Sequence, residues 1–546
     1  MGGKAALIVV VGFNLVLMIF TGKNNDISQM ASTNYVDHYC SEIAHNIALS
    51  GANLAANRFF VSPAWEPKND GLDNTAYNQG TLRVSKEETG HNGRVRIVST
   101  GRYMGIERKV TVVMQATSFG KFALFINSMG AGGGYFPTDT RFDGPVHVNV
   151  PLRNGSPDLR QRFRLKGKPT FLGKVTSDVM WQSVDSRDGG GKLSPEQTKK
   201  GVENGTLKTQ PDFQAGFEDG VHITLPNEFD QALKQAVEVG SYDEHGTQQI
   251  GFEFPKDKNI SLVFNGDGTI SYKAFDHSDT SFNTIGTRID PTAGSGGGAI
   301  DIKYPKKWDK WSDKRKQRWL KKKGYSDGNS GGSGDNGWTT VTYDELVPAG
   351  KEFNGALLIR NGNLRVKGTV DERITIAVLD QNNKEAPSIN SGTKGYYQNG
   401  EWIKFSVDPS KYFGNVWFED DVYYKDDPYK NPKSDDMLGI ISTNYMFAAD
   451  TPENNTTNLV THGSYFSLHK GATTENLFQL PNMRFGGNRV DWEYRGGWTE
   501  GEAQYTTRGS SQGYDQKYIY DTRLMKDSPP FFPATGALSI LSWYEE

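Results

Sequence analysis

Residues 5–20 read AALIVVVGFNLVLMIF, and this run contains one strongly polar residue, Asn14. A helix needs about 20 apolar residues to cross the ~30 Å hydrocarbon core of a bilayer, with about 17 as the usual lower limit, so the run is a marginal span. It fits a cleaved secretory signal, a membrane anchor, or the first part of a helix that continues outside the membrane. A cleaved signal ends in a small-x-small site, and residues 19–23 (IFTGK) offer none. The anchor and the continuing helix are therefore favoured.

The residues after this run predict a continuing helix. No proline occurs between residues 26 and 60, and apolar residues recur near the helical spacing. We expect the helix to break near Gly22 and to end before Pro63. A helix that buries its apolar side chains in an assembly would use Leu7, Val10, Val11, Phe13, Leu15, Leu17, Phe20, Ile27, Met30, Ile43 and Ile47.

The remainder of the chain has the composition of a turn-rich β protein. The 546 residues include 62 glycines, which do not follow the every-third-residue period of collagen, and 12% of the residues are aromatic. The single cysteine, Cys40, excludes an intramolecular disulfide framework and a multi-cysteine metal cluster. The net charge of −3 argues against a chain that binds polyanions over its whole surface.

Five segments are expected along the chain. Residues 1–62 form the N-terminal helix, 63–135 a small β meander, 136–180 a first β-solenoid-like unit, 181–340 an insertion, and 341–546 a second solenoid-like unit with a C-terminal cap. The two units are inferred from a repeat, because FDGPVHVN at 142–149 parallels FNGALLIR at 353–360. Short strands that are broken by glycine and carry one apolar face suit the coils of a solenoid. The predicted fold class is a mainly β body, solenoid-like or sandwich-like, with a long hydrophobic N-terminal α-helix arranged as in a pilin.

Several elements are predicted inside the insertion. Residues 229–239 form a short helix, and residues 260–272 form a hairpin, because Asn-Gly and Asp-Gly at its turn accept positive φ. Residues 306–323 contain ten Lys or Arg residues and three tryptophans on one helical face, and a Gly/Ser linker follows at 328–337. This basic helix either packs its tryptophans on the β body or binds an anionic lipid, nucleic acid or acidic glycan. The candidate surface for an anionic partner comprises Trp308, Trp311, Lys314, Arg315, Arg318 and Trp319.

No catalytic residue, metal site or cofactor is predicted. The sequence lacks a His-Glu-x-x-His motif, a Walker loop and a dinucleotide-binding fingerprint, and His147 is expected to be a hydrogen-bonded structural residue. Three acidic pairs occur close together, at 420–421, 426–427 and 435–436. They fit turn residues that cap backbone donors, ligands of a cation such as Ca²⁺, or an acid/base pair that acts on a glycan. The first interpretation is favoured, and the protein is predicted not to be an enzyme.

The C-terminal part carries a distinctive pattern: SDDMLGII at 434–441, YIYDTRL at 518–524, PPFFPATG at 529–536 and LSW at 541–543. Together with GPVHVN at 144–149 and the N-terminal helix, it resembles large bacterial pilin-like proteins related to the PilX-type pilus assembly proteins. The resemblance implies a non-enzymatic subunit of an extracellular type IV pilus-like filament, or a minor or tip component of one. The implied partners are other copies of the chain through the N-terminal helix, the pilus assembly machinery, and the inner membrane before assembly. The β body would face the outside of the cell for adhesion.

The sequence departs from a standard prepilin at the cleavage site. Cleavage after Gly3 would make Lys4 the first residue and would place Ile8 where the family has Glu. Cleavage after Gly12 would leave only eight apolar residues before Thr21. The sequence therefore leaves open whether and where a leader is removed.

Two other functions fit the same residues. A membrane-anchored adhesin at the cell surface would recognise glycan through aromatic side chains, and the candidates are Trp402, Tyr412, Trp417, Tyr423 and Tyr424. A β-helical enzyme that acts on polysaccharide would use the three acidic pairs.

Overall fold

The computed structural model describes residues 2–61, 65–88, 94–130, 134–226, 229–242, 246–279, 282, 337–387, 395–398, 401–404, 411–449, 451, 454, 457–475, 490–504, 506–508 and 512–546. The chain forms two compact units. The first unit comprises Met1–Thr117 and Gly536–Glu546, and the second comprises Ser118–Thr535. These boundaries differ from the five segments expected from the sequence, because the C-terminal strand belongs to the unit of the N-terminal helix.

The first unit consists of one long helix and an antiparallel sheet. Helix α1 runs from Gly2 to Val61. The sheet has the strand order β1-β2-β3-β4-β34, with the bounds Thr75–Tyr77, Gly80–Glu88, Arg94–Tyr103, Ile106–Ser118 and Ala534–Glu545. Strand β34 runs antiparallel beside β4, and reciprocal backbone hydrogen bonds join Lys109 and Glu546.

The helix is continuous, and the break expected near Gly22 is absent. One glycine inside a helix costs only about 1 kcal/mol relative to alanine. The long helical segments on both sides of Gly22 outweigh this cost, so the helix stays continuous. Next to the glycine, the Thr21 hydroxyl donates a hydrogen bond to the Leu17 carbonyl at 2.7 Å. The end of the helix at Val61 agrees with the prediction that it stops before Pro63.

The C-terminal part of α1 lies on the sheet through small side chains. The buried helix residues include Ala44, Ala48, Ala52 and Ala55, and they face apolar side chains of β2, β3 and β4. Gly101 on β3 lies directly below the helix, and a Cβ at this position would collide with the backbone of Ala44 and Ala48. Small residues on both surfaces therefore set the close distance between helix and sheet.

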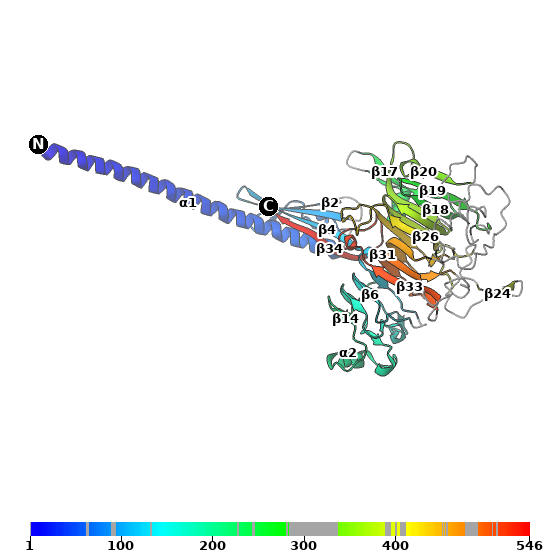
Figure 1. Ribbon diagram of the computed structural model, residues 1–546. Helices are drawn as coiled ribbons and strands as arrows, with labels where there is room; N and C mark the ends of the chain where they lie inside the picture. The colour runs from blue at the N-terminus through cyan, green and yellow to red at the C-terminus, as the bar shows by residue number, and fades with distance from the viewer. Residues whose placement is uncertain are drawn as a thin grey trace. The chain divides into compact units, whose positions relative to one another are not determined.

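The second unit is a parallel β-solenoid, in which a strand pairs in parallel with the strand one coil further along (Figure 1). One long sheet has the order β17, β21, β23, β27, β29, β31, β5, β7, β12, β15. The bounds of these strands are Gln248–Glu253, Glu352–Arg360, Arg373–Leu379, Met437–Ser442, Leu459–Ser467, Val490–Glu500, Leu124–Ile126, Val146–Val148, Val175–Ser177 and Phe217–Asp219. A second sheet contains β18 (Asn259–Asn265), β22 (Leu364–Val370), β26 (Val416–Tyr424), β28 (Met446–Ala448) and β30 (Ala472–Thr474).

Shorter elements complete this unit. Strands β6 (Arg141–Phe142), β11 (Thr170–Phe171) and β14 (Asp212–Phe213) pair in parallel, as do β10 (Arg164–Leu165) and β13 (Gln182–Ser183). Strand β33 (Gln512–Ile519) pairs in parallel with β31, while β19 (Thr269–Phe275) and β20 (Thr339–Thr342) extend antiparallel from β18. Among the described residues of this unit, the α-helices are α2 (Pro195–Glu203) and α3 (Gln231–Glu238). The antiparallel two-stranded pairs are β8–β9 (Leu152–Arg153, Ser156–Pro157), β16 (Ser241–Tyr242) with β17, β24–β25 (Gly395–Gln398, Glu401–Lys404) and β32 (Thr507–Arg508) with β33.

The prediction of a mainly β protein with a long N-terminal helix is confirmed. Of the two body architectures that the sequence allowed, the solenoid is the one formed, because its strands pair in parallel across coils instead of facing each other as two antiparallel sheets. The two predicted solenoid-like units are not separate. Phe125 of β5 pairs with Thr499 of β31 on one side and with His147 of β7 on the other, so strands of both predicted units belong to one continuous sheet. The segment 181–340 is also not a plain insertion, because it supplies β15, β17 and β18 to the parallel sheets.

The core of the solenoid contains apolar side chains and a buried ladder of asparagines. The Asn363 side chain donates to Asn259 Oδ1 at 3.0 Å, and the Asn415 side chain donates to Asn363 Oδ1 at 2.9 Å. The three residues occupy the same position on successive coils and are 0–1% exposed. Each amide thus satisfies its neighbour inside the core, where an unpaired amide would be costly.

Candidate functional site

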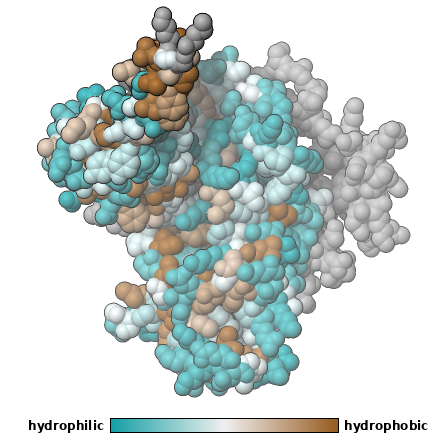
Figure 2. Space-filling model, turned by 90° about the vertical axis from the view of Figure 1, so that its left-hand side faces the viewer, coloured by the Kyte–Doolittle hydropathy of each residue, from teal (hydrophilic) through white to brown (hydrophobic). Residues whose placement is uncertain are grey.

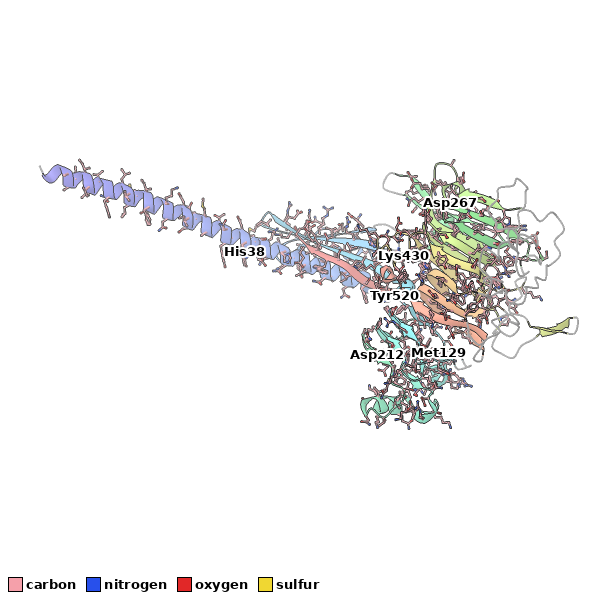
Figure 3. The ribbon with its side chains drawn as sticks, viewed as in Figure 1. His38, Met129, Asp212, Asp267, Lys430 and Tyr520 are labelled. Atoms are coloured by element: carbon pink, nitrogen blue, oxygen red, sulfur yellow. The ribbon has the colours of Figure 1, made fainter. Side chains whose placement is uncertain are left out.

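The N-terminal half of α1 is an uncovered apolar helix. All side chains described between residues 5 and 39 are exposed, and the large apolar ones between Leu7 and Phe20 are 55–78% exposed. In Figure 2 apolar side chains gather on the part of the helix that faces the viewer. Figure 3 shows side chains projecting from all sides of this half, which includes His38. By its length and composition, the helix is long and apolar enough to cross a membrane.

Nine of the eleven predicted assembly residues lie in this exposed half. Leu7, Val10, Val11, Phe13, Leu15, Leu17, Phe20, Ile27 and Met30 are 55–71% exposed. The other two lie where the helix packs on the sheet: Ile47 is fully buried and Ile43 is partly buried. Ile47 therefore contributes to the fold of its own unit, and its side chain is not free for another subunit.

Sequence reasoning missed the residues that fix the helix to its sheet. The spacing argument used large apolar side chains, whereas the contact uses Ala44, Ala48, Gly51, Ala52 and Ala55. A Cβ on Gly51 would collide with side-chain atoms of Leu82 and Ser99. Small residues spaced by three and four positions are the signal that could have located this contact.

The predicted basic surface lies outside the described residues. Trp308, Trp311, Lys314, Arg315, Arg318 and Trp319 all fall between residues 283 and 336. The role of this segment stays a prediction from its sequence.

The aromatic side chains proposed for glycan binding do not form one exposed surface. Trp417 is 1% exposed and Tyr424 is 5% exposed. The Tyr424 hydroxyl accepts a hydrogen bond from the Leu438 backbone N–H at 3.0 Å. Tyr423 is 38% exposed and Tyr412 is partly buried, while the side chain of Trp402 lies outside the described part of the structure. Among the described residues, these aromatic side chains therefore pack mainly in the hydrophobic core.

The acidic pairs accept hydrogen bonds from neighbouring groups, the first pair in strand β26 and the other two in the loop that follows it. Asp421 accepts hydrogen bonds from the Val460 N–H at 2.7 Å and from the Tyr423 hydroxyl at 2.8 Å. Asp436 accepts the Asp426 N–H at 2.7 Å, and burial raises the pKa of both the Asp421 and the Asp436 carboxyl. In the part of the chain that the structure describes, no group of three or more His, Cys, Asp or Glu side chains is arranged to hold a metal ion.

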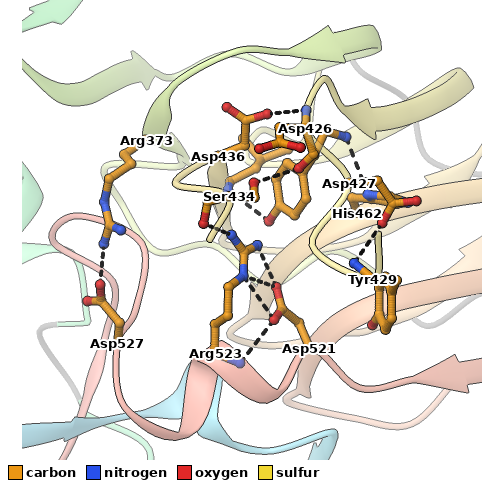
Figure 4. A network of polar contacts seen from close by, with 12 residues as sticks. Arg373, Asp426, Asp427, Tyr429, Ser434, Asp436, His462, Asp521, Arg523 and Asp527 are labelled. Atoms are coloured by element: carbon orange, nitrogen blue, oxygen red, sulfur yellow. Dashed lines mark hydrogen bonds and ion pairs between the residues drawn. The ribbon is translucent and has the colours of Figure 1, made fainter. Parts of the chain in front are cut away.

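A polar network joins these turns to the C-terminal tail, as Figure 4 shows. Arg523 forms a bidentate ion pair with Asp521, with the shortest contact at 2.7 Å, and donates to the Ser434 carbonyl at 2.7 Å. Ser434 in turn donates through its hydroxyl to the Asp426 carbonyl at 2.5 Å. Ser434 belongs to the SDDMLGII motif, and Asp521 and Arg523 belong to the YIYDTRL motif. The motifs therefore hold the loop 425–436 in place against the turn at 521–525.

His147 is a structural residue, as its position in the repeat predicts. Its side chain is completely buried, its Nε2 lies 2.7 Å from Asn149 Oδ1, and its Nδ1 lies 2.7 Å from Thr176 Oγ1. Because Asn149 Oδ1 only accepts, Nε2 carries the proton and Thr176 donates to Nδ1. Burial lowers the pKa of His147 to about 4, so the ring is neutral at pH 7.

Comparisons with known proteins give a limited set of similarities. The family described as a domain of unknown function (DUF4900) matches residues 81–179, from β2 to just after β12. No match was found among curated proteins. Among solved structures, the competence-associated pilin ComZ from Thermus thermophilus is similar with a TM-score of 0.32 and 10% identity, over 93% of this chain and 97% of that one. The more specific resemblance to PilX-type proteins stays a prediction.

Proposed function

We propose that the protein is a pilin-like structural subunit whose N-terminal helix is held in the inner membrane and then packs with other copies in an extracellular filament. The observation that carries this proposal is the apolar half of α1, which no described part of the chain covers. Twelve large apolar side chains between Leu7 and Phe20 are more than half exposed. Burying them would contribute on the order of 15 kcal/mol. Such a surface needs a bilayer or neighbouring helices.

The length of the helix favours an assembly over a simple anchor. At 1.5 Å per residue, the apolar run 5–20 is about 24 Å long, which a bilayer can cover with slight thinning. The exposed residues 21–39 add about 28 Å of helix beyond it. This second segment still exposes Ile27, Met30, Tyr35 and Tyr39, each by more than half. A bilayer matched to the run 5–20 leaves these side chains in water, whereas packing between subunits would bury them.

In this proposal the two units have separate tasks. The sheet of the first unit fixes the C-terminal half of α1, so that the exposed half continues from it as one straight element. The β-solenoid would lie outside the filament core and be available for adhesion, with the pilus assembly machinery as a further partner. Burial of Trp417 and Tyr424 gives no support to the alternative of an anchored glycan-binding adhesin that uses those side chains.

The test separates assembly from anchoring. We would express the wild-type chain, a deletion of residues 5–20, and the double variant Ile27→Ser/Tyr39→Ser, with Ser28→Ala as a control for an exposed polar position. Cells are sheared, and the released and membrane fractions are compared by immunoblot, electron microscopy and N-terminal mass spectrometry. We expect the deletion variant to be absent from both the membrane fraction and the sheared fraction. We expect the double variant to remain in the membrane fraction and to be absent from sheared filaments. Wild-type protein that stays in the membrane after shearing, with no filament, would refute the proposal.

A further inference from the structure

Asn14 is the strongly polar side chain inside the apolar run, and it has no partner within the helix. Its side chain is exposed and makes no hydrogen bond to any residue that the structure describes. Two other polar side chains of α1 behave differently. The Thr21 hydroxyl donates to the Leu17 carbonyl at 2.7 Å, and the Asn53 amide donates to the Leu49 carbonyl at 3.0 Å. Thr21 is thus satisfied by its own helix, and Asn14 is not.

The position of Asn14 prevents it from reaching water if the run lies in a membrane, a condition that rests on the proposed function. Nine residues of the run precede Asn14 and six follow it, so its Cα lies about 13 Å from one end and about 9 Å from the other. The short asparagine side chain cannot span either distance. A primary amide in hydrocarbon without hydrogen bonds costs several kcal/mol, and it therefore requires a partner at the same depth.

We propose that α1 forms a parallel, in-register homodimer in the membrane, in which the Asn14 amides of two copies hydrogen-bond to each other. The amide carries both donors and an acceptor, so two identical side chains satisfy each other. All copies enter the membrane in the same orientation, and only an in-register pair brings the two amides to one level. Polar side chains across helix pairs stabilise association in membranes, and a single asparagine in an apolar seam fixes register in coiled coils.

The residues around Asn14 form an apolar seam that suits such a pair. At 3.6 residues per turn, Leu7, Val10, Val11, Leu17, Met18 and Thr21 lie within about 60° of Asn14 around the helix. The large apolar members of this Asn14 face are 55–78% exposed. Val16 and Ile19 lie on the opposite side, about 140–160° away. The two sides are both apolar, so the position of Asn14 is what distinguishes the pairing face.

Cysteine cross-linking of the full chain in membranes tests this arrangement. In a Cys40→Ser background, which removes the single native cysteine, one cysteine is introduced at Val11 or Met18 on the Asn14 face, or at Val16 or Ile19 on the opposite side. We expect oxidation to give disulfide-linked dimers from the first two positions and little from the other two. In the Val11→Cys chain, Asn14→Leu should reduce the dimer fraction. Asn14→Gln should retain dimer, and Thr21→Val should change nothing because its hydroxyl is already satisfied.

The strength of the Asn14 hydrogen bond sets the expected effect of Asn14→Leu on the monomer–dimer equilibrium. An interhelical hydrogen bond of about 1–2 kcal/mol corresponds to a change of about 5–30-fold in the monomer–dimer equilibrium on Asn14→Leu. Equal cross-linking at all four positions, or dimer levels insensitive to Asn14→Leu, would overturn the inference while leaving the proposed function intact. A cross-link to a different membrane protein in place of a second copy would also overturn it. A wild-type chain that is absent from the membrane fraction would instead refute the proposed function, and this inference with it.

Discussion

Glu500, at the end of β31, should make the stability of the solenoid fall as the pH rises from about 4.5 to about 8. Its side chain is in the core, where the residue is 3% exposed. Its Oε1 accepts hydrogen bonds from the Ala472 N–H at 3.0 Å and from the Trp498 indole N–H at 2.9 Å. Burial raises the pKa of Glu500 from 4.5 to about 8, and these two donors together with the backbone N–H of Gln504 only partly oppose the shift. Glu500 is therefore mainly a neutral acid at pH 7.

The sign and size of the effect follow from the two pKa values. Between pH 4.5 and pH 8 the folded protein keeps a proton that the unfolded chain has lost, so raising the pH lowers the free energy of unfolding. The loss is complete above about pH 8 and amounts to about 5 kcal/mol, at about 1.4 kcal/mol for each pH unit between the two values. About 3 kcal/mol of this loss falls between pH 6 and pH 9.

The substitution Glu500→Gln isolates this contribution. Glutamine keeps the oxygen that accepts the Ala472 and Trp498 N–H groups, and it does not ionise. The free energy of unfolding of the variant, taken relative to that of the wild type, should therefore rise by about 3 kcal/mol between pH 6 and pH 9. Urea unfolding of the full chain in a nonionic detergent, followed by near-UV circular dichroism, measures the difference. Every other titrating group is common to both proteins. Parallel pH curves for wild type and variant would refute the reasoning.

Contacts elsewhere in the two units predict three more outcomes. Gly101→Val forces the helix away from β3 and should lower the free energy of unfolding by about 3 kcal/mol or more, whereas Gly22→Ala, in open space, should not lower the thermal midpoint. Asn363→Ala removes the side-chain bond to Asn259 Oδ1 and the acceptor of the Asn415 backbone N–H and side-chain amide, and it should cost about 2–4 kcal/mol in urea unfolding; an unchanged midpoint would contradict the ladder. Arg523→Ala leaves Asp521 unpaired, and limited proteolysis should then cut the loop 425–436 faster than in wild type, while equal cutting rates would argue against the network.

Local sequence patterns predicted the individual elements well. The absence of proline and the helical spacing of apolar residues predicted the C-terminal end of α1 nearly to the residue. The Asn-Gly and Asp-Gly turn gave the hairpin of β18 and β19, and α3 falls inside the predicted residues 229–239. Burial of single residues was harder to predict. Trp417 looked like a candidate for sugar stacking, but it packs against Phe447 at a ring distance of 4.9 Å in the core.

The sequence by itself determined that this protein has a long apolar helix and a glycine-rich β body, because helix and strand periodicities are properties of neighbouring residues. Only the tertiary structure decided which part of that helix is left for a partner. Ile47 and Phe20 are equally apolar in the sequence, yet the first is fully buried on the sheet and the second is 71% exposed. The order of coils was likewise fixed in three dimensions, because Phe125 pairs with Thr499 and β34 with β4. Such pairings join residues far apart in the chain, whose contact depends on the packing of everything folded between them.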